Sequence, residues 1–213
     1  MIESIGNLLR PAFDRVDEGE DFSDLPEVTL CRRLVSASDR TSITLDLGSR
    51  YMSSLQSFDL VGTCLSSGQR LILEAKCHWP TYNKKIGRLA TYKHLAGTAE
   101  SGGGSSALDL KKLFDRHKLY APDTLLGILL AGSYSVRPDH GCYDLPADFE
   151  SFAKRFRIDR PPWTYEQIIA GANSRKPNYR RDVRLYLCRA ADLSGWWATM
   201  RNLFGCRELV PAE

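Results

Sequence analysis

Two acids and a lysine stand at the ends of two otherwise apolar segments of this chain. Asp59 follows Phe58 at the start of the first segment, and Glu74 and Lys76 lie near the end of the second. Paired carboxylates are ligands of the kind that Mg²⁺ prefers, and the main-chain carbonyl of Ala75 is a further candidate ligand. A bound metal activates water and stabilises a departing oxygen, while a nearby lysine can orient or activate that water, as the base-side residue, and offset charge on a phosphate. These residue types therefore predict metal-dependent hydrolysis of a phosphodiester.

The three ionic side chains are expected to meet because residues 58–77 are predicted to form a hairpin. Two apolar strands flank a polar turn that contains glycine, at residues 66–69. Side chains two apart on a strand share a face, so Glu74 and Lys76 project together. A two-residue turn at the centre of the polar segment would place Asp59 opposite Lys76. Burying these groups among apolar strands is costly unless they bind something, which favours a functional site.

The order of Asp59, a hairpin, an apolar residue and then Glu74-Ala75-Lys76 resembles the PD-(D/E)XK nuclease superfamily, which includes restriction endonucleases and Holliday-junction resolvases. Phe58 stands where that motif often has a proline. The resemblance implies a nuclease that depends on Mg²⁺ or Mn²⁺ and cuts DNA, or alternatively RNA. Asp59, Glu74 and Lys76 would be catalytic, and Asp59, Glu74 and Ala75 would contact the metal. Many members act in defence against foreign DNA or within mobile elements.

Two other parts of the superfamily pattern fall on helices that we expect on either side of the hairpin. In many members an acid on the first helix adds a metal contact, and Glu27 has that position. The helix after the lysine often presents a polar residue to the scissile phosphate, and Arg88, Tyr92 and Lys93 are the candidates. Without the resemblance, Glu27 is also explained as an acid suited to a helix N-terminus, and the bases are also explained as a solvated helix face.

The order of predicted elements indicates an α/β fold. Periodicity predicts a helix over residues 26–38, strands over 41–47, 58–65 and 71–77, a basic helix over 83–97, a helix over 108–119 and a buried strand over 124–132. The order resembles the superfamily core of a helix, a three-stranded meander, a helix and a fourth strand. It implies a restriction-endonuclease-like mixed β-sheet core flanked by helices, within residues 26–135.

The remaining chain is divided into two further segments. Residues 1–25 are expected to be an acidic N-terminal segment, and residues 136–213 an α-rich, basic and aromatic C-terminal extension packed on the core. The extension is predicted to contain helices over 147–156, 165–172 and 194–204 and a strand over 183–188.

Charge is distributed unevenly along the chain, although the net charge is only +3. Residues 1–28 hold eight acids against two bases, and residues 151–190 hold ten bases against three acids. Such asymmetry favours a polyanionic partner for the C-terminal third. The bases expected to bind nucleic acid there and on the basic helix are Arg88, Lys93, Arg175, Lys176, Arg180 and Arg181. A solvated basic face is the alternative interpretation.

Several general features point to a cytoplasmic location. The six cysteines are scattered without a CxxC pair, which favours reduced thiols over disulfides in a chain of this length. The N-terminal residues lack the pattern of a secretory signal. No uncharged apolar stretch is long enough to cross a membrane, so no membrane association is expected.

Two alternatives to an active nuclease remain open from the sequence. The ionic residues could form a structural Glu–Lys salt bridge beside an aspartate that caps a turn, in a nuclease-like module that binds nucleic acid or assembles with other proteins without cutting. A small adaptor or inhibitor that contacts a protein through the acidic N-terminus is another class. A nuclease that cuts both strands with one site per chain would favour a homodimer, and a partner protein could set target choice.

Overall fold

Six strands form one mixed sheet at the centre of the computed structural model. The structure describes residues 5–19, 27–38, 42–48, 58–78, 82–83, 88–89, 106–136, 144–173 and 178–200. The strands of the sheet are β1 (Ile43–Leu47), β2 (Leu60–Cys64), β3 (Arg70–His78), β6 (Leu125–Ser135), β7 (Thr164–Asn173) and β8 (Tyr179–Arg189). Their spatial order is β1-β2-β3-β6-β8-β7. All pairs are antiparallel except β3 and β6, which are parallel.

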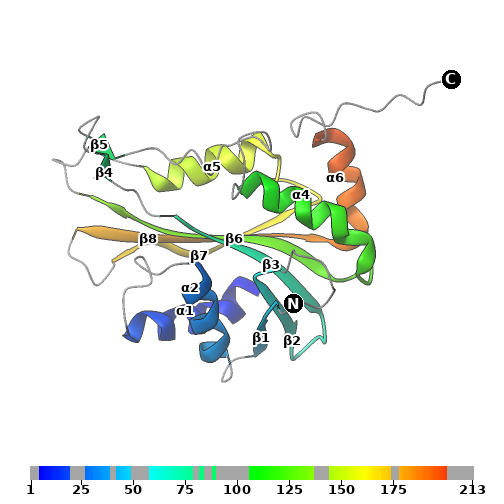
Figure 1. The fold of residues 1–213 in the computed structure, drawn as a ribbon, viewed down its shortest axis with the longest axis horizontal. Coiled ribbons are helices and arrows are strands. Elements are labelled where there is room, and N and C mark those ends of the chain that lie inside the picture. Colours follow the sequence, from blue (N-terminus) through cyan, green and yellow to red (C-terminus); the bar gives the residue numbers. More distant parts are fainter. Residues whose placement is uncertain are drawn as a thin grey trace.

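Helices cover both faces of this sheet (Figure 1). The α-helices are α1 (Ile5–Gly19), α2 (Glu27–Ser38), α4 (Ser106–Arg116), α5 (Leu145–Arg155) and α6 (Leu193–Met200), with short 3₁₀ helices η3 (His117–Leu119) and η5 (Ala190–Asp192). Figure 1 shows α1 and α2 on one face, and α4, α5 and α6 on the other. The predicted α/β class, with a mixed sheet flanked by helices, is therefore confirmed.

The hydrophobic core has two parts that the sheet separates. On the α1–α2 face, Leu71, Leu73 and Ala75 of β3 pack in a cluster with the two helices. On the opposite face, Ile72 packs in a second cluster with residues of α4, α5 and α6. Because side chains alternate along a strand, Glu74 must point to the α4 face.

The acidic N-terminal segment contains a helix that contributes to the core. Leu8, Leu9, Ala12 and Phe13 recur at the three- and four-residue spacing of a helix face, and all four are buried. They pack in the cluster on the α1–α2 face.

The crossover from β3 to β6 begins differently from the prediction. Residues 83–97 were expected to form a basic helix, but Tyr82–Asn83 (β4) and Arg88–Leu89 (β5) form an antiparallel two-stranded pair. Strand pairing uses the main-chain groups that a helix would hydrogen-bond internally, so the prediction was wrong for these residues. Residues 84–87 and 90–97 lie outside the described part of the chain. Among the described residues of the crossover, the helix is α4, close to the predicted 108–119.

The C-terminal part of the chain is also different from an α-rich extension. The strand β8 pairs with β6 from Tyr179 to Arg189 and adds the edge strand β7. The helix predicted over 165–172 is the strand β7, and that prediction was wrong. The register of β7 shifts twice, between Gln167 and Ile169 and again between Ala170 and Ala172. Such bulges break the alternation of apolar and polar residues that identifies a strand in a sequence.

None of the helices in the described ranges is long and apolar enough to span a bilayer.

Candidate active site

The hairpin of β2 and β3 brings Asp59, Glu74 and Lys76 together, although its register differs from the expected one. The strands pair as Leu60 with Leu73, and the next position places Asp59 opposite Glu74, not Lys76. The predicted pairing was therefore wrong by two residues. Because side chains alternate with a period of two, this shift leaves all three ionic side chains on the same face.

The turn of the hairpin explains the shift in register. Four residues, not two, separate Cys64 from Gln69, and the Cys64 amide donates to the Gln69 carbonyl at 2.9 Å. The amide of Gly68 also donates to the Cys64 carbonyl at 2.8 Å. Gly68 has a φ of 68°, a left-handed conformation that glycine adopts without the steric cost of a Cβ.

Glu74 is the most buried acid of the site, with 1% of its surface exposed. Its Oε1 lies 2.5 Å from Nζ of Lys112, on α4. The pKa of Glu74 is raised to about 9, chiefly by burial and next by the negative charge of Asp59, while Lys112 opposes the rise. A carboxyl in this environment needs a positive partner to remain ionised at neutral pH.

Lys76 connects the helices on the two faces of the sheet. Its Nζ lies 3.2 Å from Oε1 of Glu27, the first residue of α2, and 3.3 Å from Oδ2 of Asp109, in the first turn of α4. Burial lowers the pKa of this lysine, but the charges of Asp109 and Glu27 outweigh that effect and raise it overall. Burial raises the pKa of both carboxyls, and Lys76 opposes the rise. Lys76 is therefore held as a cation between two acids.

Asp59 is tied to the main chain of the neighbouring strand. Its Oδ2 accepts a hydrogen bond of 2.8 Å from the amide of Ala75. The side chain of Ala75 packs in the cluster on the α1–α2 face. Only the main chain of Ala75 can therefore take part in a site on the Glu74 face, as a carbonyl ligand would.

The site carries more negative than positive charge. Four carboxyl groups, from Glu27, Asp59, Glu74 and Asp109, are accompanied by two ammonium groups, those of Lys76 and Lys112, and the three acids besides Glu74 already outnumber these cations. Oxygen donors with an excess of negative charge suit a hard divalent cation such as Mg²⁺. In the conformation described, however, no three Asp, Glu, His or Cys side chains of the described residues are grouped closely enough to hold a metal ion.

Asp109 and Lys112 belong to the site but were not predicted as part of it. The sequence predicted a helix at 108–119 but assigned it no chemistry. Parallel strands require a crossover, and the helix that precedes the second strand must pack across the first. Asp109 and Lys112 are three residues apart and therefore lie on one helix face. That spacing was the signal in the sequence that could have identified them.

The residues predicted to bind nucleic acid that fall in the described part of the chain are not gathered at this site. Arg180 and Arg181 lie on β8, two strands from β3, and point to opposite faces because they are adjacent. Arg88 lies in β5 and not in a helix. Lys93, Arg175 and Lys176 lie outside the described residues, as does the alternative candidate Tyr92.

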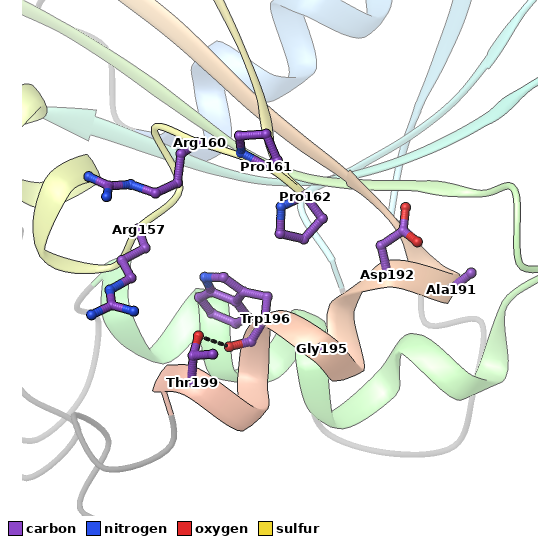
Figure 2. Close-up of a pocket in the computed structure, with 9 residues that line it drawn as sticks. All are labelled: Arg157, Arg160, Pro161, Pro162, Ala191, Asp192, Gly195, Trp196 and Thr199. Carbon is purple, nitrogen blue, oxygen red and sulfur yellow. Dashed lines mark hydrogen bonds between the residues drawn. The ribbon is translucent and has the colours of Figure 1, made fainter.

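A cavity of about 530 Å³ lies away from Asp59 and Glu74, between the turn after α5 and the helix α6 (Figure 2). Its lining residues are Arg157, Arg160, Pro161, Pro162, Ala191, Asp192, Gly195, Trp196 and Thr199. Figure 2 shows both arginines at one end and Asp192 at the other. Arg160 pairs with Asp159 at 3.0 Å, and Asp192 pairs with Arg189 at 3.0 Å. The cavity thus lacks the paired carboxylates that metal-dependent hydrolysis requires.

The chain was compared with family models, with curated proteins and with solved structures. No family model matches it, and neither a curated protein nor a solved structure is significantly similar to it.

Proposed function

We propose that this chain is a metal-dependent nuclease that hydrolyses DNA, with Asp59, Glu74 and Lys76 at its reaction centre. The observation that carries the proposal is the burial of Glu74 beside another acid. A carboxylate with 1% exposure, next to a second carboxylate and accompanied by too few cations, is costly to keep in a protein without a use. Perturbed acids of this kind are concentrated at functional sites.

The order of the surrounding elements also supports the proposal. The helix α2, the meander β1-β2-β3, the helix α4 and the strand β6 follow one another in the chain, and β6 is parallel to β3. This is the order expected for a restriction-endonuclease-like core. The strands β7 and β8 would then be additions of this chain to that core.

Both acids of the hairpin would hold the metal ion in the proposed reaction. When bound, Mg²⁺ or Mn²⁺ supplies Lewis acidity and an activated water. Asp59 and Glu74 would hold the cation, with the Ala75 carbonyl as a third candidate ligand. The hydrogen bond from the Ala75 amide orients Asp59, because it ties one carboxylate oxygen to β3.

Lys76 would act through its positive charge. Its pKa is raised above the ordinary value by Asp109 and Glu27, so it stays protonated at neutral pH. A protonated lysine cannot accept a proton from water, but it can orient a phosphate oxygen and offset its charge. Glu27 and Asp109 hold Lys76 from two helices and thereby fix its position. In this arrangement Glu27 and Asp109 are positioning residues, because each of them contacts Lys76.

The proposal is tested by a cleavage assay on linear, supercoiled, branched and single-stranded DNA, with Mg²⁺, Mn²⁺ or EDTA. Asp59→Asn, Glu74→Gln and Lys76→Met should each reduce metal-dependent cleavage by about 100-fold or more, by analogy with the loss of one transition-state contact. Asp115→Asn and Lys111→Met are matched controls, because these residues pair with each other on α4. Cleavage by the three site variants at the rate of the parent protein would contradict the assignment.

A nuclease-like module that binds nucleic acid without cutting it is the second candidate. It is favoured by the pairing of Glu27, Glu74 and Asp109 with lysines and by the lack of a metal-holding group in the described ranges. Calorimetric titration with Mg²⁺ separates the two candidates. An active nuclease should bind Mg²⁺ in competition with the lysines, and Glu74→Gln should weaken that binding. No heat of binding with the folded parent protein would favour the non-cutting module.

A further inference from the structure

The ring of Phe58, the residue before Asp59, contacts two positive side chains. Nζ of Lys112 lies 5.1 Å from the ring centroid, and Cζ of Arg116 lies 5.6 Å from it. Both separations are within the range in which a cation is attracted to an aromatic face. Tyr120 packs edge-on against the same ring, with centroids 5.9 Å apart. Phe58 is therefore the centre of a mixed basic and aromatic group.

Lys112 and Arg116 are an unfavourable pair on a helix by themselves. They are four residues apart on α4, where like charges repel. The neighbouring pair on the same helix, Lys111 and Asp115, has opposite charges and forms an ion pair at 2.5 Å. The ring of Phe58 offsets part of the repulsion between the two cations, and a polyanion beside them would offset more.

This basic group is continuous with the candidate active site. Lys112 contacts both the Phe58 ring and Glu74. Arg70 is exposed at the start of β3, four residues before Glu74 and on the same face, about 13 Å away along the strand. Burial raises the pKa of Tyr120, Arg116 and Arg70 oppose the rise, and Glu74 adds to it. The hydroxyl of Tyr120 is thus within electrostatic reach of all three charged groups.

We propose that Lys112 and Arg116, held at the ring of Phe58, and Arg70 at the start of β3 form a phosphate track along which the backbone of a nucleic acid reaches Glu74. Lys112 joins the track to the reaction centre, because it is the member that contacts a proposed metal ligand. Phosphate contacts from such side chains supply affinity without sequence preference. The direction of the track rests on the proposed function, whereas the binding itself does not.

Binding of labelled duplex and single-stranded oligonucleotides in EDTA tests the track without cleavage. Arg70→Met and Arg116→Met should each weaken binding by about 3- to 10-fold and reduce the slope of log affinity against log salt by about 1. The matched control is Arg10→Met, because Arg10 is exposed on α1, on the opposite face of the sheet. The affinity of the Arg10→Met variant for both oligonucleotides should equal that of the parent protein.

A charge-retaining variant separates loss of binding from loss of structure. Arg116→Lys should keep most of the affinity that Arg116→Met loses, because a phosphate needs the positive charge. Equal losses in Arg116→Met and Arg116→Lys would overturn the proposal, as would equal losses in Arg116→Met and Arg10→Met. Binding of neither oligonucleotide by the parent protein would also overturn it.

The phosphate track and the nuclease proposal can fail independently of each other. If the parent protein cuts no DNA but Arg70→Met and Arg116→Met bind it more weakly, the track stands and the nuclease fails. If the parent protein cuts DNA and both variants bind it as tightly as the parent does, the nuclease stands and the track fails.

Discussion

Two buried acids on the same face of the sheet, Glu74 on β3 and Asp182 on β8, have very different surroundings. Each has 1% of its surface exposed. Asp182 accepts a hydrogen bond of 2.7 Å from Nε of Arg184 and another of 3.3 Å from the side-chain Nε2 of Gln167. Glu74 instead contacts Lys112, close to further negative charge from Asp59. Burial raises the pKa of both acids. The other acid near Asp182 is the exposed Glu150, whereas Glu74 has Asp59 and the buried Asp109 as neighbours.

The strand register places these two groups only two strands apart. Lys76 of β3 is opposite Leu130 of β6, and Leu130 is opposite Arg184 of β8. Burial and position in the fold are therefore similar, and only the balance of charge differs. A buried acid with one guanidinium and an amide as partners forms a structural pair. A buried acid in a group with excess negative charge is a candidate for binding a cation.

The largest expected effect is on the structural pair. Arg184→Met leaves Asp182 buried without its cation, which should lower the free energy of unfolding by about 3–5 kcal/mol. Urea denaturation of the variant and the parent protein measures this difference. The double variant Asp182→Asn/Arg184→Met should recover much of the loss, because it removes the uncompensated charge. A stable Arg184→Met protein would show that the two acids do not differ in the way described.

The second effect is stabilisation of the candidate active site by metal. At a Mg²⁺ concentration of 100 times Kd, binding should add about 2.7 kcal/mol to the free energy of unfolding. For a chain of this length, that corresponds to a rise in Tm of about 5–10 °C. Thermal melts of the parent protein, Glu74→Gln and Asp115→Asn measure it. The rise should be absent from Glu74→Gln and present in Asp115→Asn, and equal rises in all three would place the metal elsewhere.

The effect that is smallest over a single pH unit is a dependence of stability on pH in the presence of EDTA. The pKa of Glu74 is about 9 in the folded protein, against 4.5 for an ordinary glutamate. Between these values the folded state binds the proton that the unfolded state has lost, so stability falls as pH rises. The contribution of Glu74 approaches about 1.4 kcal/mol per pH unit.

Urea denaturation at pH 5, 7 and 9 measures this slope, and Glu74→Gln should flatten it. Mg²⁺ should also flatten it in the parent protein, because the cation favours the ionised carboxylate. The same slope in the parent protein and in Glu74→Gln would assign the titration to another group.

The prediction that three ionic residues of the hairpin share one face was correct because side chains alternate along a β-strand. Alternation placed Glu74 and Lys76 on one face whatever the turn, and a register error of two residues kept Asp59 with them. The strand β6 was also predictable, because its apolar run is covered on both sides. The helix predicted at 165–172 failed because the bulges of β7 interrupt the alternation.

Sequence alone thus determined the chemistry of the hairpin: which acids and which lysine share a face, and that they would be costly to bury. Only the tertiary structure decided what surrounds them. The parallel pairing of β3 and β6 brings α4 over the hairpin, and with it Asp109, Lys112 and Arg116. Local periodicity reports which side of an element is buried, whereas the partner of a buried charge depends on a crossover that joins distant segments.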